Sequence, residues 1–327
     1  MPTIAVTRKI PEVGLQLLRA AGTVRVWGEE QAPSPAELAD LLRGCDGALT
    51  MITDAITPAV LDREPQLKVI STYAVGYDNI DVPAATARGV AICNTPGVLT
   101  EATADAAFAL LMAMARRLPE GIAYVRAGEW KFWQPLLLLG HDINGATLGI
   151  VGFGRIGQAV ARRARGFNMR VLYHSRNRRP EAEQELGATH VPLDTLLRES
   201  DFVSLHTPLS ADTRHLIGER ELGLMKRDAI LVNTARGGVV DTEAVTAALR
   251  AGRIAGAALD VTDPEPLPVG HPLADLPNAI VVPHVATSTI AVRNRMAEMA
   301  ARNLLAVLQN ERPQAIVNPE VLKHNDE

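Results

Sequence analysis

Short apolar runs rich in β-branched residues alternate with helix-patterned segments along most of this chain, and that alternation constrains the fold more than any other feature. The first series of strand-like runs covers residues 4–6, 24–26, 48–52, 68–70 and 90–92. Between them, segments such as Glu12–Ala21 and residues 35–43 show the helical spacing of apolar residues. Near-continuous apolar strands separated by helices predict a parallel sheet with helices on both faces.

The alternation restarts in the second half of the chain. An apolar helix is expected over residues 100–117, followed by a stretch rich in Trp, Pro and Gly at residues 128–140. A second series of strand-like runs covers residues 148–151, 170–173, 202–205, 229–232, 256–259 and 280–282. One long helix beyond Thr289 is too little for a third domain, so we expect it to pack on the first sheet. The sequence thus predicts two doubly wound, parallel-sheet α/β domains, residues 1–99 with 288–327 and residues 100–287.

The composition excludes several classes of protein. Hydrophobic residues make up 47% of the 327 residues and charged residues 21%, which is typical of globular domains rather than disordered chains. The net charge of −4 gives no global attraction to nucleic acid or to anionic membranes, and Cys45 and Cys93 predict neither a disulfide framework nor a zinc site. The longest apolar stretch, about ten residues, is too short to span a bilayer. Because no signal-like segment opens the chain, we expect a cytoplasmic protein, without a metal site.

Residues 148–157 join a strand-like run to a helix through a glycine-rich turn, with Gly152, Gly154 and Gly157 in the spacing G-x-G-x-x-G. In such a motif the first glycine permits a tight turn, the second lets the backbone approach a pyrophosphate, and the third lets helix and strand pack closely. The helix that starts at Arg155 and Ile156 then offers its unpaired N–H groups to the phosphates. Three glycines could simply close a structural turn, but the strand, the spacing and the helix together predict a dinucleotide site.

The segment after the next strand indicates which dinucleotide is bound. Chains that bind NAD usually carry an acidic residue about 20 residues beyond the glycines, where it contacts the ribose 2′-hydroxyl. Here residues 173–179 read Tyr-His-Ser-Arg-Asn-Arg-Arg, and no acid lies between Asp142 and Glu181. We expect Ser175, Arg176 and Asn177 to contact a 2′-phosphate, unless the arginines form only a solvated basic loop. NADP(H) is therefore the expected cofactor and NAD(H) the alternative.

Several further motifs occur in an order that identifies a family. The main ones are Asn-Thr-Ala-Arg-Gly-Gly at residues 233–238, Leu-Asp-Val-Thr-Asp-Pro-Glu-Pro at 259–266 and Val-Pro-His-Val-Ala at 282–286, with further matches at 73–81, 94–97, 149–157 and 205–209. On these motifs the chain resembles the D-isomer-specific 2-hydroxyacid dehydrogenases over nearly its whole length. Residues 128–133 and the loop at Ser175 and Arg176 look most like the glyoxylate/hydroxypyruvate reductases. The resemblance implies a Rossmann-type cofactor domain at 100–287 and a flavodoxin-like substrate domain at 1–99 and 288–327.

The resemblance also implies a reaction and its catalytic residues: NADPH-dependent reduction of small 2-keto acids, glyoxylate to glycolate and hydroxypyruvate to D-glycerate. Arg236 would bind the substrate carboxylate with its planar guanidinium, and His284 would donate a proton to the carbonyl oxygen. Glu265 would hold the imidazole and favour its protonated form. Taken singly, these residues could be a surface ion-pair arginine, a half-buried histidine and a loop carboxylate. All three follow strand-like runs, however, where open α/β sheets place their ligand sites.

Other residues are implied to contact substrate or a partner subunit. Val75 and Gly76 would bind the substrate carboxylate through backbone N–H groups, and Ile52 would line the substrate pocket. Trp133 would reach the pocket of a partner subunit or, equally, serve as a core aromatic. The resemblance implies a homodimer, for which the helix over residues 100–117 and the Trp-containing segment are the candidate interface, unless they pack between the domains.

The resemblance assigns the remaining cofactor contacts to strand-end loops of the second series. Thr207 and Pro208 would contact the adenosine side, Thr234 and Ala235 the nicotinamide ribose, and Asp260 the carboxamide. Further cofactor contacts are implied for Arg236, His284 and Ala286. Ala286 stands where the family commonly has glycine.

Two alternatives stay open. The chain could be another D-2-hydroxyacid dehydrogenase, of the phosphoglycerate, D-lactate or formate type, although most NAD-linked members would carry an acid near Ser175. It could also be a dinucleotide-sensing scaffold like the corepressors built on this fold, since such proteins can retain the same three catalytic residues.

Overall fold

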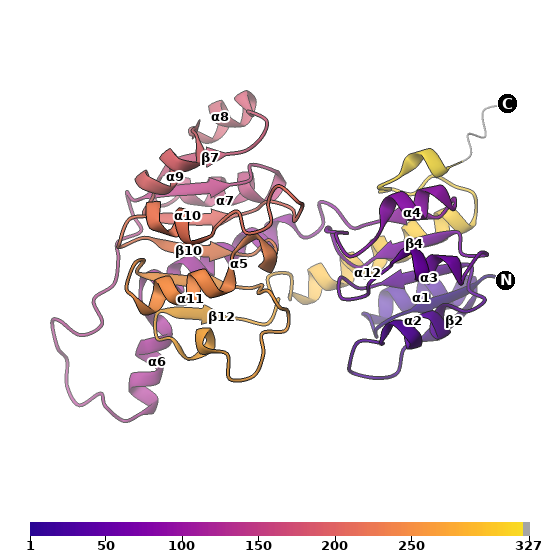
Figure 1. Ribbon diagram of the computed structural model, residues 1–327, viewed down its shortest axis with the longest axis horizontal. Helices are drawn as coiled ribbons and strands as arrows, with labels where there is room; N and C mark the ends of the chain where they lie inside the picture. Colours follow the sequence, from indigo (N-terminus) through magenta and orange to yellow (C-terminus); the bar gives the residue numbers. More distant parts are fainter. Residues whose placement is uncertain (323–327) are drawn as a thin grey trace. The chain divides into compact units, whose positions relative to one another are not determined.

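The computed structural model describes residues 1–322, and the chain divides into two compact units (Figure 1). The N-terminal unit contains Met1–Leu99 together with the chain from Ser288 onward, and the central unit contains Thr100–Thr287. Each unit is built on a parallel sheet with helices packed on it. The predicted fold class, two doubly wound α/β domains, is confirmed.

The N-terminal unit holds a five-stranded sheet in the order β2-β1-β3-β4-β5. Its strands are β1 (Thr3–Val6), β2 (Thr23–Val26), β3 (Gly47–Thr50), β4 (Val69–Thr72) and β5 (Ala91–Cys93). Its helices are α1 (Glu12–Ala21), α2 (Pro35–Leu42), α3 (Pro58–Asp62), α4 (Val82–Ala87), α12 (Ile290–Leu308) and the 3-10 turn η3 (Pro319–Val321). Helix α12 packs against α1 and strands β3, β4 and β5, while α2, α3 and α4 bury apolar side chains with the sheet in a separate core cluster.

Polar side chains set the starts of several of these helices. Ser34 forms a capping box with Glu37 at the start of α2, and Thr289 accepts a hydrogen bond from the backbone N–H of Val292 at the start of α12. These caps satisfy N–H groups that the first helical turn leaves without partners inside the helix.

The central unit holds a seven-stranded sheet in the order β12-β11-β10-β9-β6-β7-β8. Its strands are β6 (Thr147–Val151), β7 (Arg170–His174), β8 (Ala188–His190), β9 (Phe202–Leu205), β10 (Ile230–Asn233), β11 (Gly256–Leu259) and β12 (Ala279–Val281). Its helices are α5 (Thr100–Ala115), α6 (Leu118–Arg126), α7 (Arg155–Arg165), α8 (Pro180–Leu186), α9 (Leu193–Glu199), α10 (Glu219–Leu224) and α11 (Thr242–Arg250), with 3-10 turns η1 (Gly237–Val239) and η2 (Pro272–Asp275).

Two apolar clusters cover the two faces of this sheet. Helices α5 and α7 pack together and share one cluster with residues of β6, β7 and β10. The cluster also contains Phe108 of α5 and Phe153 of the turn after β6. Helices α9, α10 and α11 contribute to the other cluster, which includes Leu196 and Leu231. The strand order reverses between β6 and β9, which is the switch point where open α/β sheets bind their ligands.

The structure differs from the sequence prediction at three elements. The helix expected over residues 100–117 ends at Ala115, because Arg117 takes the left-handed conformation with φ 50°. Helix α6 then starts at Leu118, and Figure 1 shows it and the loop that follows extending away from the sheet of the central unit. Strand β8 was not predicted, since its three residues are too few to show a pattern.

None of the helices in residues 1–322 combines the length and the apolar character needed to cross a bilayer.

Candidate active site

Most of the predicted site residues lie in loops at the carboxyl ends of the strands of the central unit. Because the strands are parallel, these loops leave the same edge of the sheet. Gly152 follows β6, Ser175 follows β7, Thr207 follows β9, Arg236 follows β10, Glu265 follows β11 and His284 follows β12. The three predicted catalytic residues thus come from three strands that are neighbours in the order β12-β11-β10.

The glycine turn after β6 has the geometry that its sequence predicts. Gly152 has φ +95°, and a Cβ atom there would lie 2.6 Å from the backbone carbonyl of His206. A Cβ atom at Gly157 would lie 2.2 Å from the carbonyl oxygen of Gly152. Close approach of the backbone therefore requires glycine at both positions.

The region around the turn fits a dinucleotide. A Cβ atom at Gly154 would meet no atom within 4 Å, and no side chain caps α7, whose first turn contains Arg155 and Ile156. Among the described residues, the hydroxyls of Thr207 and Thr234 are buried without a hydrogen-bond partner. Open space beside uncapped N–H groups suits a pyrophosphate, and a bound ligand would satisfy the buried hydroxyls.

The loop after β7 holds its basic residues in different environments. Glu183 accepts hydrogen bonds from Arg178 Nε at 2.9 Å and from the Tyr173 hydroxyl at 2.6 Å. These bonds, that of Arg178 first, lower the pKa of Glu183 to about 2. Arg176 is exposed and forms no ion pair with any other residue in 1–322. Arg179 is likewise exposed without an ion pair among the described residues, so the loop offers two guanidinium groups to an external anion, and Arg176 is the one that directly follows Ser175.

Ser175, one of the predicted cofactor contacts, forms a hydrogen bond within its own loop. Its hydroxyl donates a hydrogen bond to the carbonyl oxygen of Asn177 at 2.6 Å. The side chain shapes the loop that presents Arg176, as short hydroxyl side chains commonly do in turns.

His284 and Glu265 are in direct contact. The distance between His284 Nδ1 and Glu265 Oε1 is 2.6 Å, and the side chains are 26% and 34% exposed. His284 has φ 52°, a left-handed conformation that is rare for a residue with a Cβ atom and is often found at functional sites. Both side chains are partly exposed, so a small molecule can reach them, and the left-handed backbone at His284 is kept in place by the surrounding structure.

Asp260 holds the loop that carries His284. Its carboxylate accepts hydrogen bonds from the backbone N–H groups of Val285 at 2.6 Å and Ala286 at 3.0 Å. Its carbonyl oxygen accepts a third from His284 N at 2.9 Å. Asp260 is 1% exposed, and burial raises the pKa of its carboxyl group. Ala286 lies outside the left-handed region, so its backbone conformation is one that a residue with a Cβ atom adopts without strain.

Arg236 lies in a turn fixed by Asn233. The Asn233 amide accepts a hydrogen bond from Ala235 N at 3.0 Å and donates one to the carbonyl oxygen of Arg236 at 2.9 Å. A Cβ atom at Gly237 would lie 1.8 Å from the carbonyl oxygen of Thr262, so the loops after β10 and β11 touch through their backbones. This contact ties the segment bearing Arg236 to the one bearing Glu265.

The predicted substrate residues Ile52, Val75 and Gly76 lie in the N-terminal unit, after β3 and β4, and all are half-buried. The carbonyl oxygen of Val75 accepts a hydrogen bond from Asn94 Nδ2 at 2.8 Å.

Trp133 lies in the loop after α6 and is 79% exposed, so the alternative that it is a core aromatic is wrong. The carbonyl oxygen of Pro208, next to Thr207, accepts a hydrogen bond from the Thr213 hydroxyl at 2.6 Å.

Sequence reasoning missed the supporting side chains. The sequence did not indicate a role for Asn233 or the hydrogen bond between Tyr173 and Glu183. Asp260 was predicted to contact the cofactor, but not to bind the backbone of the His284 loop. A short polar residue at the end of a buried strand, as at Asn233 and Asp260, is the signal that could have found two of them, because such side chains bind nearby backbone groups.

Three comparisons place this arrangement among known proteins. Residues 108–286 match the family model of the D-isomer specific 2-hydroxyacid dehydrogenase, NAD binding domain. The chain is 51% identical over 325 residues to a glyoxylate reductase of Thermococcus litoralis, covering 98% of each chain.

Solved structures show the same likeness. A protein from Thermus thermophilus superposes with a TM-score of 0.91 at 52% identity, over 96% of this chain and 99% of that one. An NADPH-dependent glyoxylate/hydroxypyruvate reductase of Sinorhizobium meliloti, in complex with NADP and malonate, gives 0.84 at 33% identity, over 97% and 96%. The chain therefore belongs to the D-isomer-specific 2-hydroxyacid dehydrogenase family.

Proposed function

We propose that this protein is an NADPH-dependent reductase of small 2-keto acids, which converts glyoxylate to glycolate and hydroxypyruvate to D-glycerate. The observation that carries the proposal is the 2.6 Å contact between His284 Nδ1 and Glu265 Oε1. It lies at the carboxyl edge of the sheet that also carries the glycine turn, and Arg236 follows the neighbouring strand β10. An acid, its partner and a carboxylate-binding guanidinium are the groups that 2-keto acid reduction needs.

The three side chains have different roles in the proposed reaction. Arg236 binds the substrate carboxylate with two parallel N–H groups and polarises the adjacent carbonyl. His284 donates a proton to the carbonyl oxygen, and Glu265 holds the imidazole through Nδ1, so that Nε2 faces the substrate side. The nicotinamide dinucleotide supplies the hydride when it is bound. Residues Thr207, Pro208, Thr234, Ala235 and Asp260 would contact it along the same edge.

The cofactor preference rests on Arg176. This exposed guanidinium is free of ion pairs within residues 1–322, whereas Arg178 is occupied by Glu183. A 2′-phosphate is a dianion that a guanidinium binds well and that a nearby carboxylate would repel. The Sinorhizobium meliloti relative, solved with NADP, supports the same choice.

The substrate preference rests on the relatives and on the N-terminal unit. The Thermococcus litoralis relative is a glyoxylate reductase, and that of Sinorhizobium meliloti is a glyoxylate/hydroxypyruvate reductase. We propose that Ile52, Val75 and Gly76 supply further substrate contacts, Val75 and Gly76 through backbone N–H groups.

The test is the loss of NADPH absorbance with a panel of 2-keto acids. The proposal predicts turnover of glyoxylate and hydroxypyruvate, with kcat/KM at least about 10-fold above that for pyruvate and 3-phosphohydroxypyruvate. A higher value for either of those acids would favour another dehydrogenase of the family. No turnover with any 2-keto acid, together with NADPH binding, would favour a dinucleotide-sensing scaffold.

We also propose that the protein is a homodimer formed through α6 and the loop after it. Leu118, Ile122 and Val125 are about half exposed and share one face of α6, and Trp130, Phe132, Trp133, Leu136 and Leu139 are between 61% and 79% exposed. A second copy of this chain would cover this surface, with Trp133 reaching the partner's pocket. Sedimentation velocity should show a dimer that Ile122→Asp dissociates, and a monomeric native protein would contradict the proposal.

A further inference from the structure

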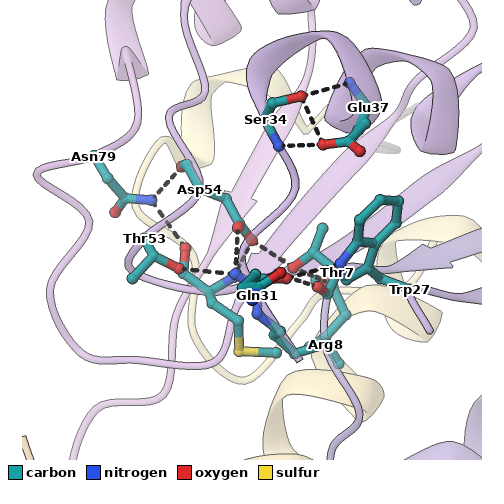
Figure 2. Close-up of polar contacts among 11 residues, drawn as sticks. Thr7, Arg8, Trp27, Gln31, Ser34, Glu37, Thr53, Asp54 and Asn79 are labelled. Atoms are coloured by element: carbon teal, nitrogen blue, oxygen red, sulfur yellow. Dashed lines mark hydrogen bonds and ion pairs between the residues drawn. The ribbon is translucent and has the colours of Figure 1, made fainter. Parts of the chain in front are cut away.

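Asp54 is a buried carboxylate outside the proposed catalytic residues. It lies in the loop after β3 and is 2% exposed. Its Oδ2 atom accepts hydrogen bonds from the Thr7 hydroxyl and, at 2.7 Å, from the backbone N–H of Met51, while Oδ1 lies 3.8 Å from Arg8 Nη2 (Figure 2). A carboxylate is costly to bury, and these contacts offset part of that cost.

The contacts of Asp54 join two loops at the switch point of the N-terminal sheet. Thr7 and Arg8 follow β1, and Met51 to Asp54 follow β3, its neighbour in the order β2-β1-β3-β4-β5. Loops at a switch point usually separate around a ligand. Here Thr7, Arg8 and Asp54 hold them together, with Arg8 Nη2 also 3.4 Å from the Thr53 hydroxyl.

A second link runs from the same loop to the segment after β4. Asn79 Nδ2 donates to the carbonyl oxygens of Asp54 at 2.7 Å and Met51 at 3.1 Å, as Figure 2 shows. The carbonyl oxygen of Asn79 in turn accepts a hydrogen bond from Ile56 N at 3.0 Å. Asn79 lies in the segment that carries Val75 and Gly76, and Ile52 lies between Met51 and Asp54.

From this arrangement we infer that Asp54 is a positioning residue for substrate binding. Its carboxylate fixes the loop that carries Ile52. The backbone carbonyl oxygens of that loop then bind Asn79 Nδ2, which fixes the loop against the segment that carries Val75 and Gly76. The inference rests on the proposed function, because those three residues are the proposed substrate contacts of the N-terminal unit. Asp54 itself is enclosed, so it acts on the substrate only through these neighbouring residues.

The variant Asp54→Ala removes the acceptor for Thr7 and for Met51 N. We expect the KM for glyoxylate to rise about 10-fold, while the KM for NADPH and kcat stay within about 3-fold, because substrate binding is affected more than chemistry. Asp54→Asn keeps an acceptor oxygen and should recover most of the affinity for glyoxylate. Asn79→Ala removes only the second link and should raise the same KM, which keeps the inference testable if Asp54→Ala does not fold.

Asp46→Ala is the matched control. Asp46 precedes β3 at its opposite end, and its carboxylate accepts a hydrogen bond from the backbone N–H of Thr3 at 2.9 Å. The control should lower the thermal midpoint as a structural contact does, yet leave the KM for glyoxylate unchanged. If Asp54→Ala and Asn79→Ala also lower only the thermal midpoint, Asp54 is merely structural and the inference is wrong.

Hydrogen–deuterium exchange gives a readout that does not depend on turnover. Peptides covering residues 50–56 and 73–81 should exchange faster in Asp54→Ala than in the native protein or in Asp46→Ala. Unchanged exchange in residues 73–81 would overturn the inference. Failure of the proposed function would appear separately, as absent turnover in the native protein.

Discussion

Glu265 Oε1 lies 2.6 Å from His284 Nδ1, and the two residues come from loops that follow neighbouring strands, β11 and β12. The contact engages one ring nitrogen, so the other, Nε2, is the one that can exchange a proton with a substrate. Asp260 supports this relationship, since it binds the backbone on the far side of His284 through Val285 and Ala286. The imidazole is therefore fixed by its side chain and by its loop.

Replacing Glu265 tests the pair from the carboxylate side. Glu265→Gln keeps the shape but loses the charge, and Glu265→Ala also loses the bond to His284. We expect kcat to fall by about 10-fold in the first and about 100-fold in the second, because the imidazole loses the partner that orients it. The control is Glu243→Gln, which alters a His–Glu pair with His271 at 3.3 Å and should leave kcat unchanged.

Cofactor selection should depend on Arg176 and much less on its neighbour. Arg176→Gln should raise the KM for NADPH by about 10-fold or more and leave that for NADH nearly unchanged, since only the former has a 2′-phosphate. Arg178→Gln is the matched control, because Glu183 already occupies that guanidinium. Equal effects of Arg176→Gln on both cofactors would rule out the phosphate contact.

A substitution at Gly154 should affect cofactor binding without affecting the stability of the fold. Its added Cβ would meet nothing within 4 Å, so Gly154→Ala should keep the native thermal midpoint. It should nevertheless raise the KM for both dinucleotides by at least about 10-fold, because the methyl group enters the space proposed for the pyrophosphate. Gly223→Ala also meets nothing within 4 Å but lies in α10, and there the KM values should not change.

Much of this architecture follows from local patterns in the sequence. The apolar alternation predicts the two sheets, and G-x-G-x-x-G predicts the turn at Gly152, because both depend on residues close together in the chain. The roles of Asp260 and Asn233 could not be predicted in the same way. Each depends on where backbone N–H groups of a turn or of another loop lie, which only the folded chain determines. The exposure of Trp133 likewise depends on the unpredicted α6.

Stability should depend on pH through His206. The Nδ1 atom of this histidine is buried without a partner in the described chain, and burial lowers its pKa from 6.5 to about 3. The unfolded chain gains a proton below pH 6.5 while the folded protein does not, so stability is present above that pH and is lost as pH falls toward 3.

Denaturant unfolding measures this loss. From pH 6.5 to about pH 5.5, His206 should reduce the free energy of unfolding by about 1 kcal/mol. His206→Gln should lack that contribution, whereas His215→Asn, a change at an exposed histidine, should retain it. An unchanged pH dependence in His206→Gln would show that His206 does not couple folding to protonation.

The role of His284 is tested by the rate of glyoxylate reduction by NADPH in the native protein and in His284→Ala. If His284 supplies the proton to the substrate carbonyl, the native protein turns over and the variant loses about 10²–10⁴-fold in kcat while still binding NADPH. Near-native turnover by His284→Ala would show that His284 is not the proton donor, because the reaction would then proceed without it.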